Sequence, residues 1–208
     1  KAIHYKSPNF GGPFIAINCA AIPKELIESE LFGYEKGAFS GAMPGGKKGL
    51  IEEAADGTLF LDEIGDLSPG AQAKLLRFLQ DGEYYRVGSS QKLTVKTRVV
   101  AATNRDLEKM ISQEQFREDL YYRLAVIKVE LPSLDQRRDD ILPIARYFLA
   151  EFAARHAGKF SGFTPEAEEF LKGYTYKGNV RELRNMIERG VLLGAGPLLQ
   201  LADLGMQS

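Results

Sequence analysis

Cysteine is almost absent from this chain, and that scarcity excludes disulfide chemistry. Cys19 is the only cysteine among the 208 residues, so no internal disulfide can form, and a reducing compartment is expected. Cys19 stands in the apolar stretch Asn18–Ala21. This setting favours a small buried side chain over a catalytic thiol.

The chain also lacks an excess of either charge and any long hydrophobic run. Its formal net charge is -1, so no general basic field exists to hold DNA, and nucleic-acid binding by this segment alone is disfavoured. No apolar run approaches the ~20 residues of a membrane span, and the start shows no signal-peptide pattern. These absences predict a cytoplasmic protein without a membrane association.

What is present is typical of a globular α/β protein. Apolar residues make up 44% of the chain and charged residues 26%. Near-continuous apolar runs predict four strands, at 13–18, 58–63, 97–103 and 126–131. Helical patterns lie between them, at 23–32 and from Ser68-Pro69 onward. This alternation predicts a parallel sheet covered by helices on both faces.

The pattern changes after Pro132, where only helices are expected. They cover 139–157, a segment beginning at Thr164-Pro165, and 179–193, which opens with Asn-Val-Arg-Glu and is similar to a capping box. The sequence therefore predicts an α/β core over residues 1–134 and a small all-helical unit over 135–208.

Polar side chains at the ends of three predicted strands are candidates for nucleotide chemistry. Asp62 and Glu63 end one strand, and such strand tips are where ligands bind in parallel sheets. An aspartate there can hold Mg²⁺ through water, and the next glutamate can polarise an attacking water. Asn104 can orient that water or a terminal phosphate, and Asn18 can hydrogen-bond Glu63 and restrain it. The alternatives are a solvated acidic strand end and ordinary turn residues.

Three arginines are candidates for phosphate contacts. Arg117 and Arg123 stand six residues apart, and arginine stabilises the charge that develops in phosphoryl transfer. Their alternative role is surface ion pairing with Glu118 or Asp119. Arg181 falls in the first turn of a helix, where the dipole disfavours a cation unless an anion lies beside it. A phosphate fits that requirement, and a pair with Glu182 is the alternative.

A glycine-rich hexapeptide forms a candidate contact loop. The flanking glycines let the backbone turn sharply and present Phe39, which suits an aromatic anchor on a partner surface. The alternative is an ordinary turn with Phe39 packed into the core. The six residues of this contact loop are Gly37, Ala38, Phe39, Ser40, Gly41 and Ala42.

Together these segments resemble the AAA+ domain of bacterial enhancer-binding proteins, the activators of sigma-54 RNA polymerase. Residues 30–42 resemble the family's ESELFGHEKGAFTGA segment, and 58–64 its Walker B strand. Residues 101–104 resemble sensor I, 116–124 the arginine-finger helix, and 178–183 the sensor II motif. Asn18 matches the asparagine of the family's glutamate switch.

The resemblance implies a function and a set of partners. Hexamer or heptamer rings of identical subunits would hydrolyse ATP with Mg²⁺ at subunit interfaces, with Arg117 and Arg123 reaching the neighbour's site. Hydrolysis would move the contact loop, which would engage sigma-54 and remodel the closed complex of RNA polymerase. The segment 84–96 would be a second moving insertion. DNA would be bound only through a domain absent from this chain.

The chain departs from the family pattern in two places. Ser40 stands where the family usually has threonine, which keeps the hydroxyl and removes a methyl. No Gly-x-x-x-x-Gly-Lys-[Ser/Thr] loop occurs, although the family carries that phosphate cradle just before the segment that resembles Lys1–Tyr5. We therefore expect that the chain has been cut from a longer one and that the fragment alone hydrolyses ATP poorly or not at all.

The sequence leaves two rival interpretations open. One is a non-enzymatic module without a P-loop that binds polymerase or partner subunits. The other is an AAA+ remodeller that never meets sigma-54, against which the contact loop argues; sigma-54 binding that survived Phe39→Ala would favour it.

Overall fold

The computed structural model describes residues 1–39, 41–156 and 160–205, and it divides into two compact units, Lys1–Lys128 and Val129–Ser208. The predicted helix end at residue 157 and the predicted role of Ser40 lie outside the described residues. Each unit has its own hydrophobic core, one drawn from residues before 125 and the other from residues after 133. No helix among the described residues has the length and apolar character needed to cross a bilayer.

The first unit is built around a parallel sheet with the strand order β1-β4-β7. Its elements are α1 (Ala2–Tyr5), β1 (Phe14–Asn18), η1 (Cys19–Ala21), α2 (Ile27–Phe32), β2 (Gly33–Tyr34), β3 (Lys47–Lys48), α3 (Leu50–Glu53), β4 (Thr58–Asp62), η2 (Ile64–Asp66), α4 (Pro69–Asp81), β5 (Glu83–Tyr85), β6 (Lys92–Thr94), β7 (Arg98–Ala101), α5 (Leu107–Ser112) and α6 (Glu118–Leu124). The α/β class predicted from the sequence is confirmed.

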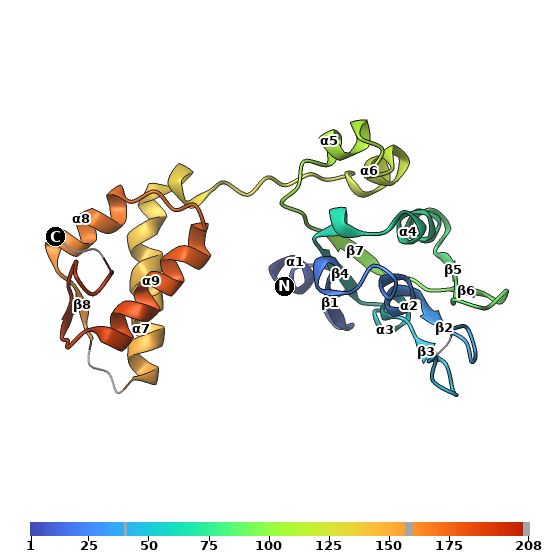
Figure 1. Cartoon of the computed structure of the whole chain (residues 1–208), viewed down its shortest axis with the longest axis horizontal. Helices are drawn as coiled ribbons and strands as arrows, with labels where there is room; N and C mark the ends of the chain where they lie inside the picture. Colours follow the sequence, from blue (N-terminus) through green and yellow to red (C-terminus); the bar gives the residue numbers. More distant parts are fainter. Residues whose placement is uncertain (40, 157–159, 206–208) are drawn as a thin grey trace. The chain divides into compact units, whose positions relative to one another are not determined.

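Helices cover one face of this sheet and leave the other only partly covered. On the covered face Ile15, Leu59 and Val99 pack into the core with residues of α2, α3 and α4, which lie together beside the sheet in Figure 1. On the opposite face Phe60 and Val100 are only half-buried. Helix α1 reaches only the start of that face, where the His4 ring contacts Phe14 and its Nδ1 lies 3.0 Å from the Thr58 hydroxyl oxygen. The prediction of cover on both faces is therefore wrong for the described residues.

The fourth predicted strand, 126–131, is also absent. The segment has no regular structure, and its apolar side chains are strongly exposed, with Val126 at 79%, Ile127 at 82% and Leu131 at 88%. A strand must pair its backbone N–H and C=O groups with a neighbour. None of the described strands pairs with this segment, so its hydrophobic pattern alone does not make it a strand.

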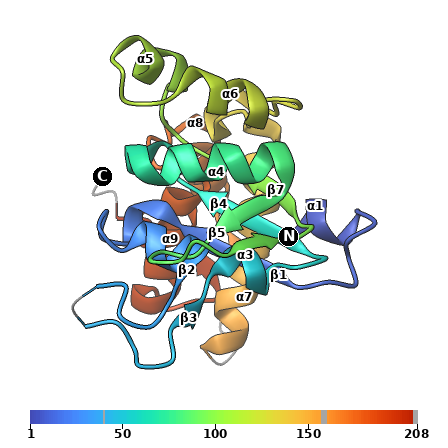
Figure 2. The ribbon, with the colours of Figure 1, turned by 90° about the vertical axis from the view of Figure 1, so that its right-hand side faces the viewer.

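Helix α4 shows how local signals fix the elements near the site. The Ser68 hydroxyl accepts a hydrogen bond from the Ala71 N–H, and Pro69 occupies the first turn, as the sequence predicts. The helix ends at Gly82, which adopts a left-handed φ of 70°. Leu75 and Phe78 supply its buried face. Figure 2 shows α4 lying across the sheet.

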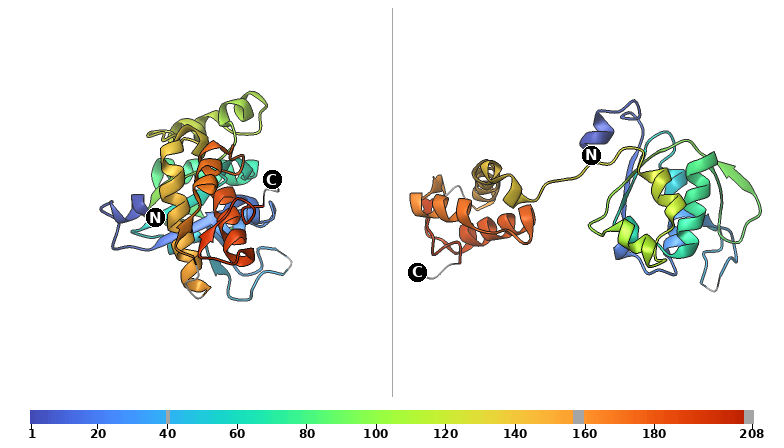
Figure 3. Two further views of the ribbon diagram at one scale, coloured as in Figure 1. Left: turned by 90° about the vertical axis from the view of Figure 1, so that its left-hand side faces the viewer. Right: turned by 90° about the horizontal axis from the view of Figure 1, so that it is seen from above.

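The second unit is helical, apart from one short strand pair. Its elements are η3 (Leu134–Gln136), η4 (Arg138–Asp140), α7 (Ile141–Arg155), β8 (Gly162–Phe163), α8 (Pro165–Gly173), α9 (Asn179–Leu193) and β9 (Leu198–Leu199). Helices α7 and α9 pack along each other (Figure 3). Their shared core includes the fully buried Leu183, Ile187 and Tyr176.

Candidate functional site

Strand register and backbone hydrogen bonds bring four predicted site residues to one edge of the sheet. Asn18 at the end of β1 is the paired neighbour of Asp62 at the end of β4. The Ala102 N–H donates to Leu61 O at 2.8 Å, and the Ile64 N–H donates to Ala102 O at 3.0 Å, which ties the end of β7 to β4. Asp62, Glu63, Asn104 and Asn18 therefore gather at the carboxyl edge, where parallel sheets bind ligands.

The Glu63 backbone is held in an unusual conformation. Its φ is 53°, in the left-handed region that non-glycine residues rarely adopt. Its N–H donates to Asp62 Oδ1 at 3.1 Å, and its Oε2 accepts from the Asn104 N–H at 3.3 Å. Such strain persists only where neighbours hold it, and it is common at functional sites. Asp62 and Glu63 both remain half-exposed, so solvent and ligand can reach them.

The expected hydrogen bond between Asn18 and Glu63 is not formed. The Asn18 Oδ1 instead accepts from the Ala20 N–H at 2.9 Å and caps the η1 turn. The short side chain satisfies the nearest free N–H, as asparagine does in turns. In the described residues Asn18 and Glu63 share no hydrogen bond, so the proposed restraint on Glu63 stays a prediction.

The carboxylates suit a hydrated Mg²⁺ better than a closed metal cage. No cluster of three or more metal-ligating side chains occurs in the described part of the chain. Mg²⁺ usually keeps several waters and takes one or two carboxylates together with substrate phosphates. Asp62 provides such an oxygen ligand, and the residues at this edge therefore fit the ion. The phosphate cradle itself is not supplied by these 208 residues.

Arg117 and Arg123 are both held by groups of their own subunit. Arg117 makes a two-pronged pair with Asp119, with Nε–Oδ1 at 3.0 Å and Nη2–Oδ2 at 2.7 Å. This pairing lowers the pKa of the Asp119 carboxyl. Arg123 donates to Leu79 O at 2.8 Å, where the carbonyls at the end of α4 favour a cation. Among the described residues neither arginine bonds Asp62 or Glu63.

Arg181 lies in the first turn of α9, as the sequence predicts, and its side chain is exposed. In residues 1–39, 41–156 and 160–205 it forms no ion pair. Glu182, the predicted alternative partner, instead accepts from the Gly178 N–H at 2.7 Å and from the Tyr174 hydroxyl at 3.0 Å. Asn179 does not cap the helix: its φ is 52°, and its Oδ1 accepts from the Leu134 N–H. Only the Glu182 half of the expected capping box is therefore present.

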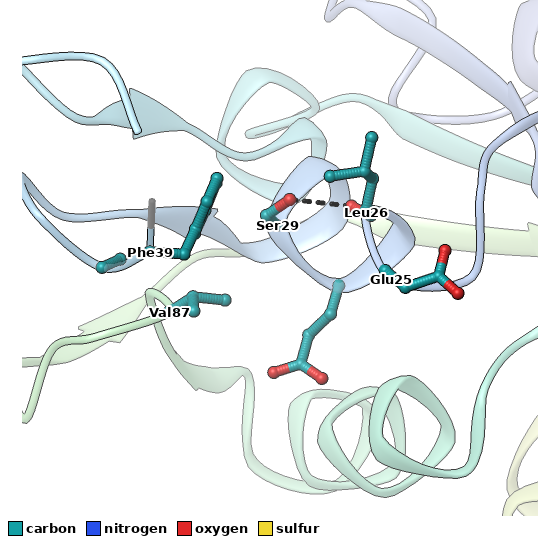
Figure 4. Close-up of a pocket in the computed structure, with 7 residues that line it drawn as sticks. Glu25, Leu26, Ser29, Phe39 and Val87 are labelled. Carbon is teal, nitrogen blue, oxygen red and sulfur yellow. Dashed lines mark hydrogen bonds between the residues drawn. The ribbon is translucent and has the colours of Figure 1, made fainter. Parts of the chain in front are cut away.

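The contact loop lies between β2 and β3, and its Phe39 packs against Tyr34 at the end of β2. Phe39 is 38% exposed, and its ring packs edge-on against Tyr34 with centroids 5.0 Å apart. Beside it a hollow of about 250 Å³ is lined by Leu26, Ser29 and Val87, with the Ser29 hydroxyl bonded to Leu26 O (Figure 4). The ring is thus accessible to a partner while one edge rests on the protein.

A charged network joins this hairpin to the second insertion, which is the β5–β6 hairpin. Arg86 bonds Glu35 Oε1 at 3.0 Å and Glu52 Oε2 at 2.8 Å, and the Tyr84 hydroxyl also donates to Glu52. Burial opposes ionisation of Glu52, but the bonds from Arg86 and Lys48 outweigh it and lower the Glu52 pKa. Burial and the adjacent Glu52 raise the pKa of Tyr84 to about 12. Sequence reasoning missed this network, because no motif marks Arg86.

The chain matches two family models that divide it in sequence order. One describes a sigma-54 interaction domain and covers residues 1–130, and the other describes an AAA+ ATPase lid domain and covers residues 135–207. The chain belongs to the sigma-54 interaction domain family. The resemblance inferred from the contact loop and the strand-end carboxylates is therefore confirmed, and this sigma-54 interaction domain carries the helical lid of AAA+ ATPases.

Known relatives match nearly all of this chain. Regulatory protein AtoC of Escherichia coli K12 is 49% identical over 207 residues, which is 100% of this chain and 45% of AtoC. The Nif-specific regulatory protein of Azotobacter vinelandii is 52% identical over 192 residues, 92% of this chain and 36% of that protein. This sigma-54 interaction domain therefore spans less than half the length of these relatives.

Solved structures agree with the fold. NtrX from Brucella abortus in complex with ADP gives a TM-score of 0.88 at 39% identity, covering 98% of this chain and 45% of NtrX. NtrX in complex with ATP gives 0.87 at 38% identity, covering 98% of this chain and 44% of NtrX. The fold of this sigma-54 interaction domain is therefore one found in a protein solved with both nucleotides.

Proposed function

We propose that this domain is the ATP-hydrolysing and sigma-54-contacting part of a ring-forming transcriptional activator. The observation that carries the proposal is the carboxyl edge of the sheet, where Asp62 and Glu63 stand beside Asn18 and Asn104. Family membership and nucleotide-bound NtrX support nucleotide as the ligand. The rival, a non-enzymatic binding module, gives no role to the adjacent carboxylates of Asp62 and Glu63 at this edge.

Each site residue has a distinct role in this mechanism. ATP supplies the phosphoryl group, and Mg²⁺, when bound, would neutralise part of its charge. Asp62 would hold that ion, and Glu63 orients the attacking water and accepts its proton. Asn104 orients that water or the terminal phosphate. Asn18, whose Oδ1 accepts from the Ala20 N–H in this structure, restrains Glu63 when the two side chains come into contact. Arg181, in the first turn of α9, offers a cation to the phosphates.

Arg117 and Arg123 act across the subunit interface. Both side chains are on the surface of their own subunit and bond neither carboxylate of the site, which supports a role in the neighbour's site. Arginine supplied by another subunit stabilises the charge of the phosphoryl transition state. Hydrolysis then moves the contact loop, and Phe39 contacts sigma-54 and remodels the closed complex of RNA polymerase.

A subunit-mixing experiment tests this arrangement in the full-length product of the gene that encodes the domain. Glu63→Gln and Arg117→Ala should each lower the ATPase kcat by about 100-fold or more. When the two variants are mixed in equal amounts, about a quarter of the interfaces join an intact Glu63 to an intact Arg117, so activity should return.

Glu53→Gln is the matched control, because Glu53 is an exposed acid on α3. Its kcat should stay at the wild-type value. Failure of the mixture to recover activity would place Arg117 in its own subunit's site. A wild-type protein that binds ATP and never hydrolyses it would establish the rival binding module.

A further inference from the structure

One polar side chain in the first unit is almost completely buried without belonging to the site just described. Gln72 lies in the first turn of α4 and is 1% exposed. Burying an amide costs free energy unless its hydrogen bonds are made inside the protein. A glutamine at this depth therefore needs partners, and its partners indicate its role.

The Gln72 amide makes three hydrogen bonds that join two separate stretches of backbone. Its Nε2 donates to Leu67 O at 2.9 Å and to Gln115 O at 3.1 Å, and its Oε1 accepts from the Arg117 N–H at 3.0 Å. Both donors and one acceptor position of the amide are thereby used. The orientation is unambiguous, since a flipped amide would set its oxygen against two carbonyls.

The joined stretches carry the two halves of the proposed catalytic machinery. Leu67 closes the η2 turn, which begins directly after Glu63. Arg117 immediately precedes α6, and its neighbour Phe116 is buried in the core. Gln72 is thus a direct polar bridge between the segment of Glu63 and the segment of Arg117.

We propose that Gln72 is a positioning residue that sets where Arg117 is presented to the neighbouring subunit. A shift of the η2 turn moves Leu67 O, and the Gln72 amide moves with it because the two are hydrogen-bonded. The Arg117 backbone then moves too, because its N–H donates to the same amide. The state of one nucleotide site thereby changes the arginine offered to the next site. This inference rests on the proposed function, because it assigns Gln72 to the same reaction.

Gln72→Met tests the bridge, because methionine keeps the length of the side chain and removes its three hydrogen bonds. A displacement of about 1 Å at a reacting group costs on the order of 100-fold, so we expect kcat to fall about 10- to 100-fold. ATP binding should remain. Gln80→Met is the matched control: Gln80 is exposed on the same helix and should keep the wild-type kcat.

Subunit mixing separates positioning from general damage. A Gln72→Met subunit has a sound site and a misplaced Arg117, so it should recover activity when mixed with Glu63→Gln and stay inactive when mixed with Arg117→Ala. The reverse pattern would mean that Gln72 serves its own site and would overturn the proposal, as would an unchanged kcat. A wild-type kcat in Arg117→Ala would instead refute the proposed function itself.

A second variant covers the case in which Gln72→Met does not fold. Gln72→Asn keeps a buried amide but is shorter by one methylene, about 1.5 Å, so it cannot reach all three partners. We expect the same recovery pattern with a smaller loss of kcat. An unchanged kcat in folded Gln72→Asn would count against the bridge.

Discussion

At the scale of single residues, burial controls chemistry that the sequence only suggests. Cys19 is 2% exposed, and desolvation, followed by the nearby Asp66 and Asp62, raises the pKa of its thiol from 9.0 to about 12. A buried, protonated thiol is a poor nucleophile. The interpretation of Cys19 as a small buried residue is confirmed.

We expect Cys19 to react with a disulfide reagent at pH 8 only when the protein opens. The folded state holds the thiol proton more tightly, so the stability contributed by this group is complete below pH 9 and is lost as the pH rises through about 12. Labelling kinetics with and without urea measure the effect. Fast labelling of the folded protein at pH 8 would contradict the assigned burial.

The sequence predicted where site residues lie along the backbone when a motif fixed that position. It did not predict which hydrogen-bond partner a side chain has. Asp62 and Glu63 lie at the strand tip because the apolar run of β4 ends there. Asn18 bonds the nearby Ala20 N–H rather than Glu63, and Gln72 gives no sequence signal at all. These outcomes depend on which free N–H or C=O lies within reach, and that information comes only with the folded chain.

At the scale of elements, the contact loop and the β5–β6 hairpin behave as one assembly. The Glu35 N–H donates to Val87 O at 3.0 Å, and the Val87 N–H donates to Gly33 O at 2.9 Å. Gly88 has a φ of 78°, and a Cβ added there would lie 2.9 Å from the Ala38 Cβ. Glycine at position 88 is therefore what lets the second insertion touch the contact loop.

We expect Gly88→Ala to loosen the contact loop. The left-handed backbone costs alanine roughly 1–2 kcal/mol, and the clash with Ala38 adds to that cost. Because Lys36 is exposed at the base of the loop, trypsin should cleave there faster than in the wild type. Gly45→Ala is the control, since an added Cβ meets nothing within 4 Å. Equal cleavage rates in both variants would show that the contact at Gly88 does not hold the contact loop in place.

Helix signals proved more reliable than strand signals at this scale. Ser68-Pro69 and Thr164-Pro165 each begin a helix with the expected cap, because a cap is a local interaction. The segment 126–131 has a strand's hydrophobicity and no pairing partner among the described strands. Strand formation depends on a distant neighbour, which periodicity does not reveal.

At the scale of the whole molecule, the two hydrophobic cores share no residue. Each unit therefore has its own source of stability, and we expect two unfolding transitions in calorimetry. Leu183→Ala empties a fully buried position in the second core and should cost about 2–5 kcal/mol. Only one transition should move.

Leu75→Ala is the matched variant for the first core, and it should shift the other transition. A single transition that responds equally to both variants would show that the units unfold as one. The same pair of variants tests whether the two predicted parts, 1–134 and 135–208, unfold separately.

The half-buried face of the sheet, with Phe14, Phe60 and Val100, has a consequence for solution work on this domain. Dyes such as ANS fluoresce on exposed apolar surface, and that signal is commonly attributed to a molten globule. The folded chain offers apolar surface here and, more strongly, along residues 126–131, where Val126 is 79% and Leu131 is 88% exposed. Dye fluorescence of this 208-residue chain would therefore report folded protein, and a loss of signal on heating would mark unfolding.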